Sequence, residues 1–452
     1  MTAKQADGFT QEVAANATKY HYQMLPDDVI FLAKTCVLDW IGVTLAGAKE
    51  PLTQILLENA RQQGGHPQAT IIGFGDKLST QQASLINGAA SHALDYDDVN
   101  MQFLGHPTVT VLPSVLALAE LNQSTGQHLI ASFVAGYETE CRIGAAMGNT
   151  HYNKGWHGTA TIGTFGSAAG CGHFLGLDEH QMATALGISA TQAAGLKSQF
   201  GTMSKPFHAG KAAVNGLLAA TLAQKEFTSR LDMLECEQGF ADTQTTSFDP
   251  TKGQGGKDDY HIRENLFKYH AACYLTHSAI EAGMSITKKH TFDPDAIKSV
   301  TIIVDPSSLR VCNILSPDTG LEIKFSLRHT TAFALCGINT AGMDSYSDAN
   351  ARDPKLVALR EKIRVETSTE GPQTAAQVIV ETNSGDHYEA SADIGVPRSD
   401  LQAQWDQLGA KFHSLADPIL GKSHANKVIS QVSTLENMSN VAELLPSLIW
   451  VE

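Results

Sequence analysis

Residues 155–174 read GWHGTATIGTFGSAAGCGHF, a stretch dominated by glycine, alanine, serine and threonine. The same small residues recur between residues 84 and 225, for example in Gly88-Ala89-Ala90. The side chains at a helix contact determine how closely two helices approach each other. This texture therefore predicts a compact bundle of closely packed helices.

The helical pattern extends outward from this stretch and covers the chain up to about residue 262. Residues 26–28 (PDD) place proline and two acids where the first turn of a helix favours them. Apolar residues then recur at helical spacing over residues 29–41. Two pairs have the spacing of capping boxes, which begin helices: Ser79 with Gln82, and Asp178 with Gln181.

The texture changes after about residue 265. Residues 297–305 (IKSVTIIVD) form a β-branched run that predicts a strand, and residues 376–390 alternate around NSGD, which predicts a hairpin. Helical patterns lie at about 271–288, 322–338 and 353–363, so this region is expected to be α+β. From Asp400 the chain returns to helix, and we expect this tail to pack onto the N-terminal bundle.

Length and charge limit the classes of function. A chain of 452 residues is expected to form two or three domains. Its net charge is 32 − 47 = −15, and no run of Lys or Arg offsets it, so nucleic acid is not an expected partner. An acidic surface also repels anionic substrates at long range. Binding of a polyacid therefore requires a local cluster of cationic and donor groups.

The cysteines and the apolar stretches indicate the cellular compartment in which the protein is expected. Seven cysteines are scattered without a C-x-x-C pair, which favours reduced thiols and a cytoplasmic protein. Residues 1–12 lack the apolar core of a signal peptide. Apolar stretches are interrupted by glycine, serine or charge before about 18 residues, so we expect no membrane partner.

Polar groups next to glycine or alanine are concentrated in four places. These are residues 92–98 (HALDYDD) with 105–108 (GHPT), residues 155–159 (GWHGT), residues 201–211 (GTMSKPFHAGK) and residues 268–273 (KYHAAC). Each is a candidate for chemistry.

Three acids, Asp95, Asp97 and Asp98, allow three interpretations. Oxygen-rich loops bind Ca²⁺ or Mg²⁺, but this one lacks the spaced glycine and distal glutamate of an EF-hand. The acids would otherwise cap a helix end. In the third interpretation, one carboxylate orients a histidine or shares a proton with a substrate.

His106 and His157 lie beside or close to a glycine, where a ring can face a cavity. A single histidine is more often a surface or core residue, so these two count mainly as a pair. Histidine titrates near neutrality and is the commonest acid/base group. Together they are candidates for an acid/base pair.

Lysines supply the candidate anion site. Lys205 and Lys268 lie in segments with little other positive charge, where a solvated surface lysine is the simpler interpretation. Lys205, His208 and Lys211, however, place three cationic or donor groups within seven residues. A helix starting at about residue 208 would add its N-terminal dipole, and the combination suits a carboxylate.

Other chemistries have little support. The chain has no G-x-S-x-G elbow, and Cys273 near His270 and His277 is a weak case for a nucleophilic thiol. No G-x-G-x-x-G follows a predicted strand and no phosphate-binding G-x-x-x-x-G-K-[ST] is present. A nucleotide cofactor is therefore not expected.

The polar stretches, taken as a set, resemble the MmgE/PrpD family. The segments that carry the likeness are HALDYDD with GHPT, GWHGTATIG, FGTMSKPFHAGKAA, FKYHAACYLTH and KFSLRHTTA at 324–332, over roughly residues 20–420. The resemblance implies a mainly α fold. It implies a large all-α domain formed by both chain ends (1–264 with 398–452), a smaller α+β lid domain (265–397) and a homodimer.

The resemblance also implies a function. Family activities include 2-methylcitrate dehydration, cis-aconitate decarboxylation and iminodisuccinate epimerisation, and it implies no metal or organic cofactor for these reactions on a small polycarboxylate. By position, His106 would be the acid/base at carbon and His157 a second donor or base. Lys205 and Lys268 would hold carboxylates and stabilise enolate charge, and Asp95 would orient a histidine or lysine.

Three positions depart from the decarboxylase-type pattern: Val99 replaces threonine, Cys273 replaces histidine and His329 replaces tyrosine. These changes replace polar contacts to a substrate arm, so the resemblance leaves dehydration, decarboxylation and epimerisation open. We place Cys273 and His329, with His208 and Lys211, among the predicted substrate-binding residues. A non-catalytic carboxylate-binding protein and a metal-dependent hydro-lyase are the contrasting classes.

Overall fold

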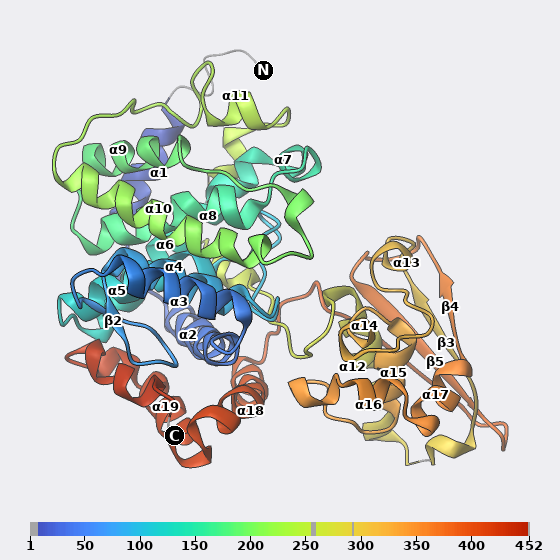
Figure 1. Ribbon diagram of the computed structural model, residues 1–452. Coiled ribbons are helices and arrows are strands. Elements are labelled where there is room, and N and C mark those ends of the chain that lie inside the picture. Colours follow the sequence, from blue (N-terminus) through green and yellow to red (C-terminus); the bar gives the residue numbers. More distant parts are fainter. Residues whose placement is uncertain (1–7, 255–258, 292, 451–452) are drawn as a thin grey trace. The chain divides into compact units, whose positions relative to one another are not determined.

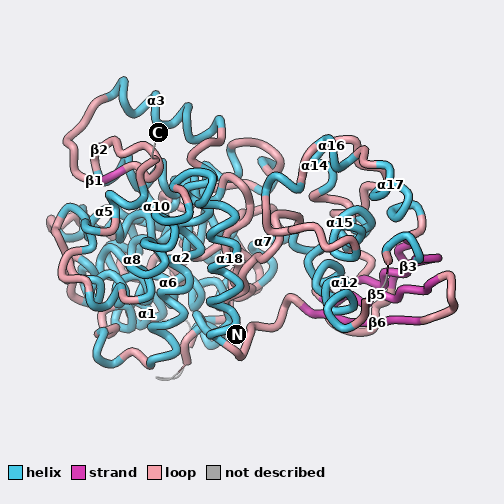
Figure 2. The backbone as a smooth tube through the Cα atoms, turned by 90° about the horizontal axis from the view of Figure 1, so that it is seen from below, coloured by secondary structure: helices cyan, strands magenta, loops and turns pink. Residues whose placement is uncertain are grey.

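The computed structural model describes residues 8–254, 259–291 and 293–450, and it is predominantly helical (Figures 1 and 2). The mainly α class is thus confirmed. Contacts divide the chain into two units: Met1–Phe267 with Asp400–Glu452, and Lys268–Ser399.

The first unit consists of helices and one short pair of strands. Its helices are α1 (Phe9–Ala17), α2 (Asp27–Gly47), α3 (Pro51–Gln63), α4 (Thr80–His92), α5 (Thr108–Leu121), α6 (Gly126–Met147), α7 (Asn149–Asn153), α8 (Gly158–Phe174), α9 (Glu179–Ala190), α10 (Ser204–Gln224), α11 (Phe240–Gln244), α18 (Leu401–Leu420) and α19 (Lys422–Ser433). The strands β1 (Ala69–Thr70) and β2 (Lys77–Leu78) pair antiparallel.

Small residues allow the central helices of this unit to approach closely. α10 packs against both α8 and α4. A Cβ atom on Gly210 of α10 would lie 2.1 Å from the carbonyl oxygen of Leu85 in α4, and one on Gly216 would lie 2.4 Å from the Ser167 side chain in α8. These distances are well inside van der Waals contact, so glycine is required at both places, as the small-residue texture predicts.

The C-terminal segment packs back onto the beginning of the chain. Figures 1 and 2 both show α18 beside α2, and these two helices are in contact. Trp405 of α18 packs against Phe31 of α2 with ring centroids 5.7 Å apart. Lys411 of α18 is buried, forms an ion pair with Asp39 of α2 at 2.6 Å, and donates to the Tyr96 carbonyl oxygen at 2.7 Å. Both chain ends therefore build the first unit.

Among helices in the described residues, α2 alone has the length and apolar composition of a membrane span, with a hydropathy of 1.8. Of its most apolar 18-residue window, 78% is buried inside the protein, which is the behaviour of a core helix.

The second unit combines a sheet with helices. Its helices are α12 (His277–Lys289), α13 (Ser308–Val311), α14 (Gly320–Ile323), α15 (Leu327–Leu335), α16 (Asp348–Ala351) and α17 (Pro354–Glu361). Its strands are β3 (Ile297–Val304), β4 (Ile363–Thr367), β5 (Ala375–Thr382) and β6 (His387–Asp393). The sheet order is β4-β3-β5-β6, with β3 and β4 parallel and the other neighbours antiparallel.

The core of this unit lies between the sheet and the helices α12 and α15. Alternate residues of β5 are buried, as the period of a strand requires. The strand predicted at 297–305 and the hairpin predicted at 376–390 are confirmed as β3 and as β5–β6. The helix expected at 322–338 is wrong in extent, because Ser326 caps a separate helix by accepting a hydrogen bond from the His329 amide.

Candidate active site

The turn between α4 and α5 carries most of the polar groups of the site. α4 ends at His92, and Asp95 follows with a φ of 51°, a left-handed conformation that turns the chain sharply. Val99 then exchanges backbone hydrogen bonds with Leu266 at 2.8 and 2.9 Å. His106 follows, and its amide donates to Thr159 Oγ1 at 3.1 Å. Backbone bonds at both ends therefore hold this turn in place.

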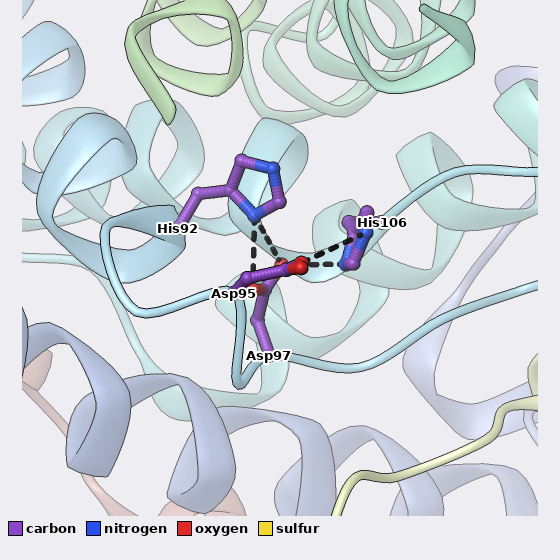
Figure 3. Close-up of side chains that lie close together, drawn as sticks. All are labelled: His92, Asp95, Asp97 and His106. Carbon is purple, nitrogen blue, oxygen red and sulfur yellow. Dashed lines mark hydrogen bonds and ion pairs between the residues drawn. The ribbon is translucent and has the colours of Figure 1, made fainter. Parts of the chain in front are cut away.

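Asp97 lies at the centre of a buried cluster (Figure 3). His92 Nδ1 lies 2.9 and 3.0 Å from the two carboxylate oxygens of Asp97, and His106 Nδ1 lies 2.9 Å from Oδ2. Burial raises the pKa of Asp97, but His106 and His92 outweigh it and hold that pKa well below its usual range. Burial is also the main reason why the pKa of His92 falls to about 4. The carboxylate is therefore charged and the His92 ring is neutral near pH 7.

The second nitrogen of His106 faces the outer part of the cluster. His106 Nε2 lies 3.6 Å from Asp95 Oδ1, and Lys205 Nζ lies 2.8 Å from the same oxygen. The Asp95 side chain is 51% exposed, whereas those of His106 and Lys205 are 12% and 15% exposed. The His106 ring thus lies between the buried carboxylate of Asp97, on its Nδ1 side, and the accessible carboxylate of Asp95, on its Nε2 side. The Lys205 ammonium contacts Asp95 as well.

His157 lies beside this cluster at the start of α8. Its ring centroid is 6.0 Å from that of His92, and its Nδ1 is 3.1 Å from His208 Nδ1. Burial first, and then the neighbouring His92 and Lys205, lower the pKa of His157 well below its ordinary value. A Cβ on the adjacent Gly158 would lie 2.3 Å from the Phe103 carbonyl oxygen, so glycine is required for the ring to reach this place. His157 is a neutral imidazole over the physiological range.

Lys205 lies in the first turn of α10, which begins at Ser204 and not at about residue 208 as predicted. Its ammonium lies 5.2 Å from the centroid of the Phe200 ring. His208 is one turn later, where burial and then Lys205 lower its pKa. Within the described residues, no hydrogen bond or ion pair joins Lys211 to this cluster, and burial lowers the pKa of Lys211. The structure thus brings together Asp95, His106, His157, Lys205 and His208.

Comparison with known proteins identifies the family of the chain. The sequence profile of the MmgE/PrpD N-terminal domain matches residues 11–252, and that of the MmgE/PrpD C-terminal domain matches residues 270–437. The chain belongs to the MmgE/PrpD family. A cis-aconitate decarboxylase from Aspergillus terreus is 27% identical over 98% of both chains. The cis-aconitate decarboxylase from Homo sapiens is 25% identical over 93% of this chain and 90% of its own, and that from Mus musculus is 24% identical over 93% and 89%.

These relatives support a lyase role for this MmgE/PrpD protein at the level of the family. Identities near 25% do not extend to a particular substrate or reaction. Those finer properties depend on the side chains of the cluster.

Three predicted site residues of this MmgE/PrpD chain belong to the second unit. Lys268 is buried, and Cys273 packs against the core of that unit. His329 is buried at the start of α15, with Nε2 3.2 Å from the Asn350 carbonyl oxygen, and mainly burial lowers its pKa to about 4. A neutral ring bonded to a backbone carbonyl is typical of a structural histidine. The roles assigned to these three residues stay predictions.

Two residues of the cluster were missed by sequence reasoning. His92 and Asp97 lie in the HALDYDD stretch, but the orienting role was assigned to Asp95. One signal was available, since His92 precedes the acids by only a few residues in the same stretch. Asp98 behaves as the capping interpretation expects, because it accepts from Thr108 Oγ1 at 2.5 Å and from the Thr108 amide at 3.3 Å, at the start of α5.

The cluster also contains atoms that bind metals. Ligand atoms of His92, Asp95, Asp97 and His106 all lie within 4.8 Å of one another, and imidazole and carboxylate groups suit zinc. Lys205, however, places an ammonium 2.8 Å from Asp95, and two histidines flank Asp97. Side chains of the cluster already contact both carboxylates, so we assign the cluster to proton transfer and carboxylate binding. A metal-free site stays a prediction, tested by chelation.

Proposed function

We propose that this protein is a cofactor-independent lyase that moves a proton at a carbon next to a carboxylate in a small di- or tricarboxylate. The observation that carries the proposal is the placement of His106. Its Nδ1 lies against the buried Asp97 carboxylate, and its Nε2 faces the accessible side, next to Asp95 and Lys205. A positioned histidine of this kind is suited to general acid–base catalysis.

Lys205 provides the anchor for the substrate. A substrate carboxylate competes with the half-exposed Asp95 for the Lys205 ammonium and forms a charge-assisted hydrogen bond. The N-terminal end of α10 adds its dipole at the same place. His208 and Lys211, one and two turns along that helix, and Lys268 are proposed to hold further carboxylates.

His106 and His157 then share the proton transfer. Removing a proton or CO₂ from a carbon next to a carboxylate leaves an electron pair that spreads into an enolate-like system. Lys205 and Lys268 are proposed to stabilise that charge, which is often the largest single contribution to catalysis. His106 Nε2 removes or delivers the proton. The neutral His157 serves as a second base or donor.

Decarboxylation of cis-aconitate is the first reaction to test, because the Aspergillus terreus relative with that name spans 98% of both chains. In that reaction the bond to one carboxylate carbon breaks, CO₂ leaves, and the electron pair shifts through the adjacent double bond. His106 Nε2 takes up a proton from solvent and delivers it to the carbon, which completes the five-carbon product. Val99, Cys273 and His329 replace the polar residues expected there, so dehydration and epimerisation are tested in parallel.

Proton NMR of the purified protein in D₂O tests the proposal. The panel contains cis-aconitate, 2-methylcitrate, citrate, iminodisuccinate, and malate- and aspartate-type acids, each with His106→Asn as the matched variant. We expect deuterium to enter a carbon next to a carboxylate with the wild-type protein, and at least about 1000-fold more slowly with the variant. Loss of CO₂, loss of water or exchange without net product distinguishes the three reactions. Saturable binding without exchange for every acid would instead indicate the non-catalytic carboxylate-binding protein.

The expected homodimer and cytoplasmic location are part of the proposal. Light scattering during gel filtration should give twice the 48.4 kDa chain mass. A mass of one chain at micromolar concentration would contradict the dimer.

A further inference from the structure

We propose that His92 and Asp97 form a buried positioning pair that fixes the tautomer and ring orientation of His106. The inference rests on the proposed function for its catalytic consequence, but its structural content stands on the contacts alone. It assigns the orienting role to Asp97 in place of Asp95, and it gives His92 a role as well.

Asp97 is better placed than Asp95 to orient His106. Asp97 lies 2.9 Å from His106 and its side chain is 2% exposed. Asp95 lies 3.6 Å from the other nitrogen, is half exposed, and is held by Lys205 at 2.8 Å. A buried carboxylate at hydrogen-bond distance fixes a ring, whereas an exposed carboxylate that is shared with a lysine is available to exchange with substrate.

The contacts of Asp97 determine which nitrogen atoms carry protons. An ionised carboxylate only accepts hydrogen bonds, so His92 Nδ1, which is hydrogen-bonded to it, carries hydrogen. His106 Nδ1 lies 2.9 Å from Asp97 Oδ2 as an ion-pair contact without hydrogen-bond geometry, and we assign hydrogen to this nitrogen because a bare lone pair would repel the carboxylate. His92 Nε2 is buried and has no hydrogen-bond partner among the described residues, as expected of a neutral ring with its proton on Nδ1. The reactive atom of His106 is therefore Nε2.

His92 keeps Asp97 in place. Its Nδ1 reaches both carboxylate oxygens, at 2.9 and 3.0 Å, so the carboxylate cannot rotate away from His106 without losing this donor. His92 is the last residue of α4, and its side chain is fully buried. The groups that face His106 are thus His92 from α4, Asp95 and Asp97 from the turn, and Lys205 from α10. A buried pair of this kind, connected to an acid/base group, is typical of functional sites.

The test uses four variants and two measurements. Asp97→Asn removes the charge, and His92→Leu removes the donor. His92→Asn keeps an N–H close to the position of Nδ1, and Asp98→Asn changes a neighbouring buried acid that contacts Thr108 and Asn265 instead of a histidine. Two-bond ¹H–¹⁵N spectra of histidine-labelled protein report the ring tautomers without any substrate. kcat and KM are measured on the acid that the D₂O panel identifies.

We expect wild-type His106 and His92 to show protonated Nδ1 at pH 7.5. Asp97→Asn should mix the His106 tautomers and lower kcat about 100-fold, with KM changed less than about 3-fold. His92→Leu should lower kcat about 10-fold, and His92→Asn should restore most of it. Asp98→Asn should leave the tautomers and kcat unchanged.

The positioning pair would be overturned by an unchanged His106 tautomer in Asp97→Asn. It would also be overturned by equal kcat values in His92→Leu and His92→Asn. Neither result would contradict the proposed function. If Asp97→Asn fails to fold, the two His92 variants decide. If no acid is turned over, the proposed function fails. The ¹H–¹⁵N spectra still show whether Asp97 and His92 fix the tautomer of His106.

Discussion

Two histidine-rich regions of the first unit differ in what surrounds their rings. One is the cluster of His92, His106, His157 and His208. The other is a cavity of about 470 Å³ between the start of α6 and the end of α8, where His21, His128 and His173 are among the lining residues. Both contain several imidazoles within a short distance, so histidine content alone does not separate them.

The partners of the rings separate the two regions. His173 Nε2 donates to the Tyr20 carbonyl oxygen at 2.7 Å, and its Nδ1 lies 2.9 Å from Ser132 Oγ. His128 stacks on Phe174 with ring centroids 4.3 Å apart. No Asp, Glu, Lys or Arg occurs among the described residues that line the cavity. In the cluster, by contrast, His106 has a carboxylate on each side and an ammonium beside it. The rings of the cavity thus have neutral partners, whereas His106 lies between charged groups that suit an acid/base role.

The largest expected effect comes from exchanging the reactive ring. His106→Asn should lower kcat at least about 1000-fold, because both proton transfer and its electrostatic support are lost. His128→Asn, in the cavity, should change kcat less than about 2-fold. Steady-state kinetics of the two variants and the wild-type protein measure these changes in kcat. Equal losses in both would mean that the cavity takes part in turnover.

The next effect concerns the ammonium that distinguishes the cluster. Lys205→Met should raise KM about 10- to 100-fold, the equivalent of one charge-assisted hydrogen bond of roughly 1.5–3 kcal/mol. It should also lower kcat, because the same ammonium is proposed to stabilise the enolate charge. Lys197→Met is the matched control, since Lys197 donates to the Tyr152 carbonyl oxygen at 3.1 Å and lies over that ring. Its KM should stay within about 2-fold. An unchanged KM for Lys205→Met would remove Lys205 from substrate binding.

A smaller effect should appear in stability at the cavity. Burial lowers the pKa of His173 to about 4, against 6.5 for an ordinary histidine. The unfolded chain therefore binds a proton below about pH 6.5 that the folded chain takes up only near pH 4, and stability falls as the pH falls through this range. Between pH 7.5 and 5 this one residue should cost about 2 kcal/mol.

His173→Gln, which lacks a titrating ring, should reduce that pH dependence of the free energy of unfolding and leave kcat unchanged. Urea unfolding at the two pH values measures it. The same loss of stability in the variant as in the wild type would show that His173 is not a source of the acid sensitivity.

The smallest effect is expected from removing metals. Dialysis against EDTA should change kcat by less than about 2-fold, because Lys205 and the histidines already contact both carboxylates of the cluster. Elemental analysis of the active protein is the control. Loss of activity on chelation, restored by Zn²⁺, would contradict this expectation. It would indicate that the protein is a metal-dependent hydro-lyase whose ligands are His92, Asp95, Asp97 and His106.

Local signals explain how much of the fold was predictable. The capping boxes at Ser79 and Asp178 are confirmed, because capping depends on residues three positions apart. The β3 strand and the β5–β6 hairpin are confirmed for a similar reason. The start of α10 was predicted four residues late, because Ser204-Lys205-Pro206 begins the helix without a side-chain cap.

The site was less predictable than the fold. Motif order indicated the family, which the two matching domain profiles show. The contact of Asp97 with two histidines, however, depends on the left-handed conformation at Asp95 and on the tie between Val99 and Leu266, more than 160 residues away along the chain. Neither is visible in a local pattern. The roles of Lys268, Cys273, His329, His208 and Lys211 stay predictions.

The ion pair of Lys411 with Asp39 has a consequence for the order of biosynthesis. Lys411 also donates to the Tyr96 carbonyl oxygen, in the middle of the turn that carries Asp95 and Asp97, across 315 positions of sequence. Domains generally fold as units during synthesis, beginning with the N-terminal part. Here a ribosome must translate beyond α18 before this brace exists. A growing chain therefore lacks this contact with the turn until α18 has been made, and a chain that stalls in the second unit never forms it.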